Sequence, residues 1–562
     1  MAEELTKALP AKDYVDRHKR LLKQRKEYEG DWKDIQDYVF PRKGMFFEEG
    51  QKSEDKKSHS KIIDPEALMD LKDLAAALLT GMTPKSRPWL RLTLQERDMM
   101  DNPEVKSWFH RATSHMLDIF AWSNLYTALH SIYKETAGFG TGCMLEEEDI
   151  DSFAHFITFT AGEYCLAVNS IGQVDTFYRE YELSARNCVK EFGEDVVHEE
   201  IRRSAIEAGK QDKVFKIAHC IQPNVDFNPN MWDVNGMEFE SVYWCKDKAD
   251  RIYKRSGYHE FPIFAPRWDV TTTASVYGDS PSRDMLGHIK MLQEMNSGQV
   301  KAIHKELDPP MRTPAAFKGR LSMVPGAQNV DPNPDGKGIG KLFDMNFDYN
   351  GVSAKIEDIR LQLRRGYYID LLKMLASRPG VQPVTAREIA ERSEEKMFLL
   401  SPLLERFHKD MLNPLITRTF NMIVRKGMLP PPPEDIMGLP MKIEYNSLLA
   451  QAQKLMGLQS LDTFMGFVGQ VAQVLPDVLD KINPDEMVDE YADSTGVQPK
   501  IVLGNDEVAE IRQQRAEQQQ QQAALEQAAA GASAVKDLGL AKTEDTALGQ
   551  LTEAVQAGGT NV

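Results

Sequence analysis

Residues 352–427 hold two long runs, VSAKIEDIRLQLRRGYYIDLLKML (352–375) and TAREIAERSEEKMFLLSPLLERFHKDMLNPLITRTFNMIVRKG (385–427). Apolar residues recur every three or four positions in both runs, which predicts two helices. We expect Pro402 and Pro414 to bend the second helix. Between the runs, ASRPGVQP (376–383) is too rich in proline and glycine to continue a helix. Two long helices therefore meet at a short loop.

The sequence before residue 352 predicts a partner for the first of these helices. Ser280 and Pro281 form an N-cap and first-turn pair, so we expect a helix over 281–306. The stretch 308–351 is rich in proline and glycine and predicts a small insertion with two or three short strands at most. Helix, insertion and helix together predict a hairpin of two long helices with a small domain at its tip.

The N-terminal half predicts a mixed α+β region that extends to about residue 275. Hydrophobic spacing predicts helices over 10–40, 65–82 and 102–136. Alternating apolar residues predict strands, and the turn at 169–172 predicts a β-hairpin. The expected strands are 88–94, several short runs within 143–183, and then 213–222, 239–246 and 249–257. The predicted fold class is therefore α+β and mainly helical.

The C-terminal part changes in composition twice. LPPPPEDI (429–436) predicts a stiff linker, and 444–504 predicts a cluster of helices. Residues 506–562 are rich in glutamine and alanine, with few large apolar side chains. Two interpretations stay open for this tail: a disordered segment, or a helix ordered only by packing against identical copies.

Bulk composition limits the possible functions. At 562 residues the chain is expected to form three or more domains. A net charge of −17 argues against tight wrapping of nucleic acid, but is compatible with DNA sliding past. The five cysteines are scattered singly and predict reduced thiols rather than a zinc site or disulfides. The first residues do not resemble a secretion signal, and no apolar run reaches the roughly 18 residues of a membrane span.

Three motifs have a structural and a functional interpretation. The glycine-rich 138–142 lacks the Gly-Lys-Ser/Thr of a phosphate-binding loop, so we interpret it as a helix-to-strand turn. The acidic run 146–149 suits a hard cation, but we expect an exposed acidic edge. His219 is expected to be a core histidine. The sequence singles out no catalytic residue, metal ligand or cofactor site, although a paired-carboxylate site stays open.

Basic residues gather on the two predicted hairpin helices. They are Lys290, Lys301 and Lys305 on the first, with Arg360, Arg364 and Arg365 on the second. One interpretation is a solvated helix face with acidic partners one turn away. The other is a set of positive rings inside a channel, if copies of the chain form a ring.

Several stretches resemble the portal, or head-to-tail connector, proteins of short-tailed bacteriophages. The resemblance rests on Thr83-Pro84 with PWLRL (88–92), AGFGTGCML (137–145), GEYCLAVNSIGQVDTFYREYEL (162–183) and VTAREIAERSEEKMFLLSPLLERFHKDMLNPLITR (384–418). Their order and spacing extend over most of residues 10–430. Beyond residue 430 the likeness lies in composition and position.

The resemblance implies a portal fold with a wing, a two-helix stem, a small α/β clip, a helical crown and a C-terminal helical barrel. It assigns 1–280 and 386–444 to the wing, 281–306 and 353–375 to the stem, 307–352 to the clip, 445–504 to the crown and 505–562 to the barrel or tail. Residues 376–385 would be the channel loop that faces DNA. Its members would be Ser377, Arg378, Pro379, Gly380, Val381 and Gln382, and lumen-facing cations would be Lys290, Lys301, Lys305, Arg360 and Arg364.

The resemblance also implies what the protein does and where. It implies a ring of twelve subunits at one capsid vertex of the virion, assembled in the host cytoplasm, through which double-stranded viral DNA is packaged and ejected. The implied partners are the terminase large subunit, tail or adaptor proteins at the clip, and capsid and scaffolding proteins, with no membrane, cofactor or catalytic activity. Two alternatives stay open: a non-viral ring-forming or coiled-coil scaffold, and an enzyme with an unrecognised carboxylate site.

Overall fold

The computed structural model describes residues 11–41, 43–44, 61–95, 102–248, 250–312, 322, 340–341, 347–370, 401–436, 438–446, 464–471, 483–495, 508–509 and 511–523. The chain divides into two compact units, residues 1–95 with 107–459, and residues 96–106 with 460–562. No helix in the described ranges is long and apolar enough to cross a membrane.

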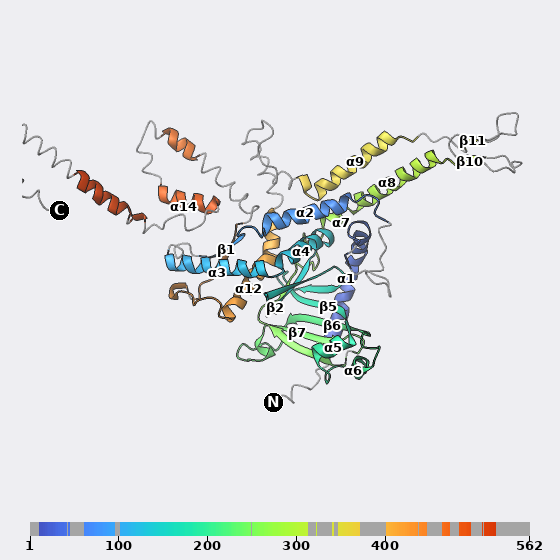
Figure 1. Ribbon diagram of the computed structural model, residues 1–562, viewed down its shortest axis with the longest axis horizontal. Coiled ribbons are helices and arrows are strands. Elements are labelled where there is room, and N and C mark those ends of the chain that lie inside the picture. Colours follow the sequence, from blue (N-terminus) through green and yellow to red (C-terminus); the bar gives the residue numbers. More distant parts are fainter. Residues whose placement is uncertain are drawn as a thin grey trace, which may run out of the picture. The chain divides into compact units, whose positions relative to one another are not determined.

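Two helices form where the N-terminal spacing predicts them (Figure 1). They are α1 (Lys12–Tyr38) and α2 (Glu66–Met82). Pro65 occupies the cap position of α2, and the carboxylate of the preceding Asp64 accepts a hydrogen bond from the Glu66 amide at 3.0 Å. The buried side of α2 contains Leu71, Leu74 and Leu78, which are at most 1% exposed.

The single helix predicted over 102–136 is wrong, because the structure has two. α3 (Pro103–Trp122) and α4 (Leu125–Phe139) are separated at Ser123 and Asn124. The Asn124 side-chain amide donates to the Phe156 carbonyl and accepts from the Phe156 backbone amide, both at 2.8 Å. These bonds tie Asn124 to a strand that is distant in sequence, and local spacing gives no sign of them.

A five-stranded antiparallel sheet forms the centre of the larger unit. Its strands follow chain order as β4 (Tyr164–Val168), β5 (Val174–Ser184), β6 (Val214–Pro223), β7 (Phe239–Cys245) and β8 (Ile252–Tyr258). The predicted hairpin turn at 169–172 joins β4 to β5, with Gly172 at φ +80°. The predicted strands of this sheet are confirmed to within a few residues.

Helices cover both faces of this sheet (Figure 1). On one face, α5 (Ala185–Phe192) and α6 (Glu199–Ile206) bury Phe192 and Ile201 against Ile217 and Tyr243. On the other face, α1 places Leu21 in a cluster with Tyr178 and Trp244. His219 lies within the sheet, fully buried and stacked on Tyr243 with ring centroids 3.9 Å apart. The predicted core histidine is confirmed, and burial holds its pKa well below the ordinary value.

A smaller sheet follows the glycine-rich turn. β2 (Cys143–Asp149) lies between β3 (Phe153–Phe159) and β9 (Ile263–Phe264). The predicted helix-to-strand turn is confirmed, since Gly140 ends α4 at φ +85°. A Cβ atom at Gly140 would collide with the Gly278 carbonyl oxygen, so only glycine fits.

The predicted exposed acidic edge at 146–149 is wrong for its first residue. Glu146 is fully buried, 3.3 Å from the Arg418 guanidinium, and accepts a hydrogen bond from Thr419 at 2.9 Å. Burial raises the pKa of Glu146 to about 7, against the lowering effect of Arg418. Alternation along β2 placed this carboxylate on the inner face, beneath the helix that contains Arg418.

The end of the second long run is helical but not regular. A helix runs from residue 401, passes through a π-helical turn (His408–Leu412), and continues as α12 (Asn413–Arg425). Pro414 lacks an amide hydrogen, so the backbone hydrogen-bond ladder is interrupted there, and the π turn ends two residues before it at Leu412. The beginning of this run, 385–400, lies outside the described residues.

A strand that the sequence did not predict follows the proline-rich linker. β12 (Met441–Tyr445) pairs antiparallel with β1 (Leu90–Leu94), with Leu90 opposite Tyr445. The five residues MKIEY are too short to reveal a strand without their partner.

The second unit is helical over its described residues. It contains a helix over 464–471, α14 (Pro484–Thr495), and a helix over 511–523. Arg512 forms an ion pair with Asp485 at 2.6 Å, and every side chain over 511–523 is exposed. This part of the Gln/Ala-rich tail is therefore helical, as one of the two interpretations requires.

Candidate functional site

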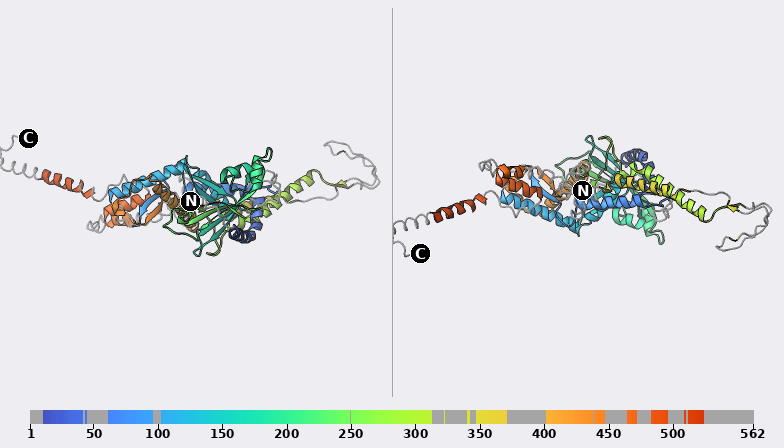
Figure 2. Two further views of the ribbon diagram at one scale, coloured as in Figure 1. Left: turned by 90° about the horizontal axis from the view of Figure 1, so that it is seen from below. Right: turned by 90° about the horizontal axis from the view of Figure 1, so that it is seen from above.

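The candidate site is the predicted helical hairpin. α8 (Leu286–Leu307) and α9 (Tyr349–Gly366) pack side by side, and the short strands β10 (Met311–Arg312) and β11 (Gly340–Lys341) pair beyond their ends (Figures 1 and 2). Buried aliphatic side chains line the inner sides of both helices, among them Ile289, Leu292, Ile356, Ile359 and Leu363.

The first hairpin helix begins as predicted but is not continuous. Ser280 caps a short helix, α7 (Pro281–Asp284), by accepting a hydrogen bond from the Arg283 amide at 3.1 Å. Met285 separates α7 from α8. The predicted single helix over 281–306 is therefore interrupted one turn from its start.

The second hairpin helix is interrupted at residues 367–368, and helical backbone resumes at 369–370, where this described range ends. α9 stops at Gly366, and Tyr368 takes a left-handed conformation at φ +59°. Tyr367 is fully buried, and its hydroxyl lies 2.8 Å from the Ser282 hydroxyl. Packing of Tyr367 against α7 accounts for the turn.

Asp64 anchors both hairpin helices to the start of α2. Its side chain is 3% exposed and accepts from the Arg360 guanidinium at 2.8 Å and from the Asn296 amide at 3.1 Å. Gln293 on α8 bonds the backbone of Asp64 at 2.8 Å and 2.9 Å. These bonds hold α8 and α9 to one point of the body.

Further ion pairs surround this anchor. Arg364 lies 2.6 Å from Glu66, and Lys290 lies 2.7 Å from Asp34 on α1. The hydrogen bonds with Asp64 and Glu66 raise the pKa of Arg360 and of Arg364, so both stay charged. Sequence spacing could not reveal these acidic partners, because each lies far from its cation along the chain.

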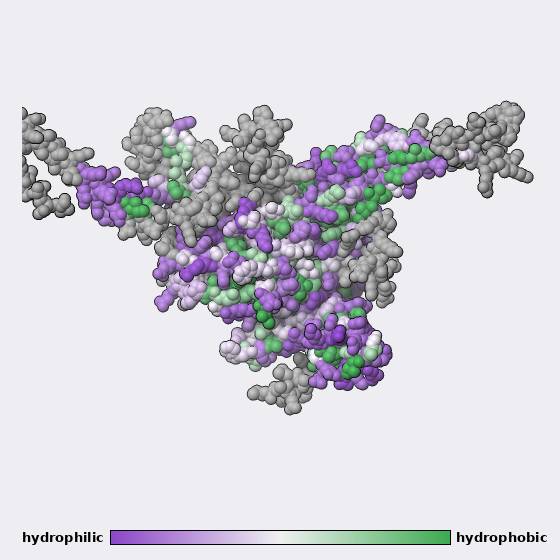
Figure 3. Space-filling view, in the orientation of Figure 1, coloured by the Kyte–Doolittle hydropathy of each residue, from purple (hydrophilic) through white to green (hydrophobic). Residues whose placement is uncertain are grey.

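The predicted basic residues thus divide into two groups. Lys290, Arg360 and Arg364 are neutralised by carboxylates of the same chain. Lys301 and Lys305 are exposed near the end of α8, and no ion pair with another described residue involves them. Arg365 on α9 is exposed as well. Apolar side chains lie among the polar ones along the hairpin surface (Figure 3).

The remaining predicted site residues belong to the channel loop. The channel-loop residues Ser377, Arg378, Pro379, Gly380, Val381 and Gln382 lie outside the described residues, as does most of the insertion between β10 and β11. Within the described ranges, no group of three or more His, Cys, Asp or Glu side chains is placed to hold a metal ion.

Residues 11–502 match the family described as bacteriophage head to tail connecting protein. The chain belongs to this family. The curated relatives include a probable portal protein of Bordetella phage BPP-1, which is 37% identical over 522 residues, 92% of each chain. They also include the portal protein of Salmonella phage epsilon15, which is 35% identical over 536 residues, 94% of this chain and 96% of the relative. The portal function predicted from the sequence is confirmed.

Solved structures of similar chains are distant. One, titled "Neck of empty GTA particle computed with C6 symmetry", is 12% identical with a TM-score of 0.32, covering 78% of this chain and 91% of its own. Another, titled "Neck of native GTA particle computed with C12 symmetry", is 11% identical with a TM-score of 0.30, covering 75% and 88%.

Proposed function

We propose that copies of this chain form a ring of twelve at one capsid vertex, around a channel through which double-stranded viral DNA is packaged and ejected. The observation that supports this most is membership of the head-to-tail connecting family over residues 11–502. The anchored hairpin supplies an element suited to line such a channel.

We assign the parts of the portal to the chain in the following way. α8 and α9 form the stem, the insertion that begins and ends with β10 and β11 forms the clip, and the sheets with α12 form the wing. Residues 445–504 form the crown, and 505–562 extend the channel as a barrel. Residues 376–385 form the loop that narrows it.

The net negative charge of the chain favours movement of DNA through the ring over tight binding of DNA to it. Each copy carries a net charge of −17, so an acidic ring repels phosphates along most of its surface. Lys301 and Lys305 are the hairpin lysines that have no ion-pair partner among the described residues. Their repetition around a ring provides weak, salt-sensitive contacts with passing phosphates.

The remaining proposed roles are those of a connector protein that catalyses no reaction itself. The ring carries no catalytic activity, and nucleotide hydrolysis belongs to the terminase whose large subunit docks on it. Tail or adaptor proteins bind the clip afterwards, and capsid and scaffolding proteins bind during assembly in the host cytoplasm.

Purified protein tests the proposal directly. We expect negative-stain images of ring particles with a central hole, and no ATPase or nuclease activity in the same preparation. A preparation that stays monomeric at micromolar concentration, or that hydrolyses ATP, contradicts it.

A further inference from the structure

The loop between β6 and β7 presents apolar side chains to solvent. Trp232 is 103% exposed and Val225 is 93% exposed, while Met231 and Phe227 are 48% and 41% exposed. Exposed apolar groups that gather in one place mark protein-contact surfaces, and tryptophan is prominent among residues that dominate binding energy. We call residues 224–238 the tryptophan loop.

The tryptophan loop is held in shape by its own hydrogen bonds. The Asn224 side chain donates to the Val234 and Met237 carbonyls, both at 3.1 Å. The Asn228 amide donates to the Asn235 carbonyl at 2.7 Å, and Asp233 caps Asn235 at 3.0 Å. Because the loop is already ordered, little conformational entropy is lost when Trp232 is bound.

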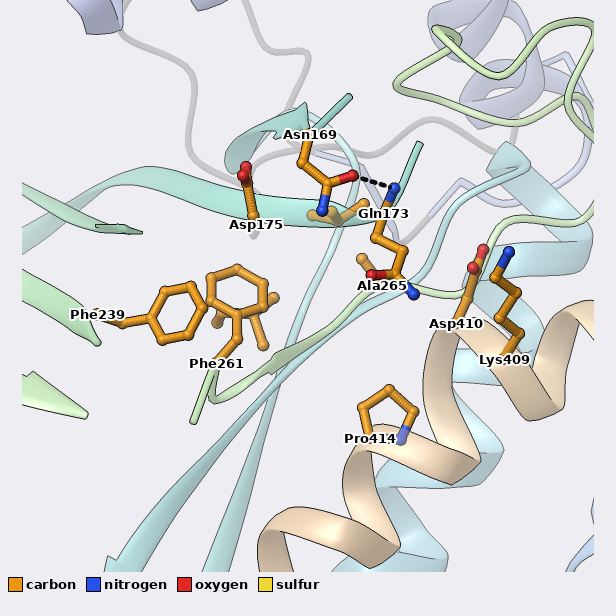
Figure 4. A pocket seen from close by; sticks show the side chains of 11 residues that line it. Asn169, Gln173, Asp175, Phe239, Phe261, Ala265, Lys409, Asp410 and Pro414 are labelled. Carbon is orange, nitrogen blue, oxygen red and sulfur yellow. Dashed lines mark hydrogen bonds between the residues drawn. The ribbon is translucent and has the colours of Figure 1, made fainter. Parts of the chain in front are cut away.

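The same chain contains a hollow of matching chemistry. A pocket of about 230 Å³ lies between the hairpin turn of β4 and β5, the segment 261–265 and the π-helical turn before α12 (Figure 4). Phe239 and Phe261 contact each other with ring centroids 5.1 Å apart and form an aromatic wall. Ile263, Ala265 and Pro414 add further apolar surface.

The rim of this pocket is polar and contains one cation without a partner among the described residues. Lys409 is exposed, and no ion pair with another described residue involves it. Its neighbour Asp410 is neutralised by Arg267 at 3.0 Å. Asp175 accepts a hydrogen bond from Thr176 at 2.9 Å, and Asn169 and Gln173 add amide groups at the rim.

The loop and the pocket complement each other in size and charge. A flat apolar indole fits an aromatic hollow of this volume, and the side-chain amide oxygen of Gln173 at the rim can accept a hydrogen bond from its N–H. The Asn169 oxygen already accepts from the Ile171 and Gln173 backbone amides. Asp233, which follows Trp232, is exposed and can face Lys409. Full exposure means that Trp232 does not fill the pocket of its own chain.

We infer that Trp232 of one copy enters this pocket on the next copy of the chain, with Asp233 facing Lys409. A projection and a hollow on one chain form a head-to-tail contact, which generates a ring when the rotation between neighbouring copies closes. The inference rests on the proposed ring and names a contact that holds the ring together.

Covalent trapping tests where the loop binds. The double variant Asp233→Cys with Lys409→Cys keeps Trp232 and replaces the proposed ion pair with two thiols. Under mild oxidation we expect a ladder of disulfide-linked copies on a non-reducing gel. The five native cysteines are buried and should not interfere. Asp226→Cys with Lys409→Cys is the matched control, because Asp226 lies on the same loop at a different point, and it should give no ladder.

Substitution of the anchor tests its contribution. We expect Trp232→Ala to raise the concentration needed for ring formation by about tenfold or more. Trp122→Ala removes another exposed tryptophan, 79% exposed, and should leave assembly unchanged. Rings that form normally from Trp232→Ala, or trapping within a single chain, overturn the contact but leave the portal function intact. Wild-type protein that forms no ring contradicts both.

Discussion

At the scale of single residues, Asp64 explains why two helices distant from it in sequence meet at one place. Its carboxylate is 3% exposed and accepts hydrogen bonds from Arg360 on α9, from Asn296 on α8 and from the backbone amide of Glu66 in the first turn of α2. A buried carboxylate is tolerated only when its hydrogen bonds are satisfied, and here three elements satisfy it.

We therefore expect Asp64→Asn to loosen the hairpin without unfolding the sheets. Removal of the charged acceptor should cost about 2 kcal/mol at this site, because Arg360 is partly solvated and retains Glu357. Hydrogen exchange should accelerate in α9. The control Asp358→Asn, an exposed carboxylate on the same helix, should leave exchange unchanged. Equal acceleration in both variants contradicts the anchoring role.

Glu146 predicts a pH dependence of stability. Its pKa is about 7 in the folded protein against an ordinary 4.5, so the native state binds more protons between these values. Stability from this group is therefore lost as pH rises from about 4.5 to 7, by about 3 kcal/mol in total. Glu146→Gln should reduce the change of melting temperature with pH between about 4.5 and 7. Glu148→Gln should leave that pH dependence unchanged. An unchanged slope in Glu146→Gln contradicts this account.

At the scale of elements, periodicity predicts the α8–α9 hairpin. It does not predict how the hairpin is attached to the start of α2 through Asp64. Apolar spacing and the Ser280–Pro281 cap indicated where the hairpin helices begin. Sequence alone could not show that Tyr367 turns back onto α7, or that Glu146 lies beneath Arg418, because these contacts join residues far apart in the chain. Strand β12 and the break at Asn124 were missed for the same reason.

The hairpin lysines lead to a test of the channel. We expect Lys301→Glu with Lys305→Glu to form rings and to weaken binding of DNA. The slope of log affinity against log salt should fall by about one for each phosphate that the variant no longer binds. The control is Lys19→Glu with Lys23→Glu on α1, which makes the same change of charge outside the hairpin. Identical DNA binding in the two double variants contradicts a lumenal role for Lys301 and Lys305.

The segment 376–385 leads to a second test at this scale. Shortening it should leave rings intact and impair packaging or DNA retention, because it is proposed to narrow the channel. A packaging assay with rings of confirmed size measures this. If the shortened chain fails to assemble, the segment has a structural role and its assignment as a channel loop is wrong.

At the scale of the whole molecule, the family match over residues 11–502 leaves the Gln/Ala-rich tail beyond its end. The described helix of this tail, 511–523, exposes every side chain and has no apolar face to bury within one copy. We expect a chain that ends at residue 504 to keep its sheets and hairpin and still to form rings. Circular dichroism and particle images of the truncated chain check this, and disappearance of all rings contradicts treatment of the tail as an extension.

The central claim is that this chain closes into a portal ring around a channel. Class-averaged electron micrographs of the purified protein, viewed along the particle axis, test it most directly. We predict a ring of twelve copies with a central opening. A uniform population of monomers under packaging-like salt, or closed particles without an opening, contradicts the account.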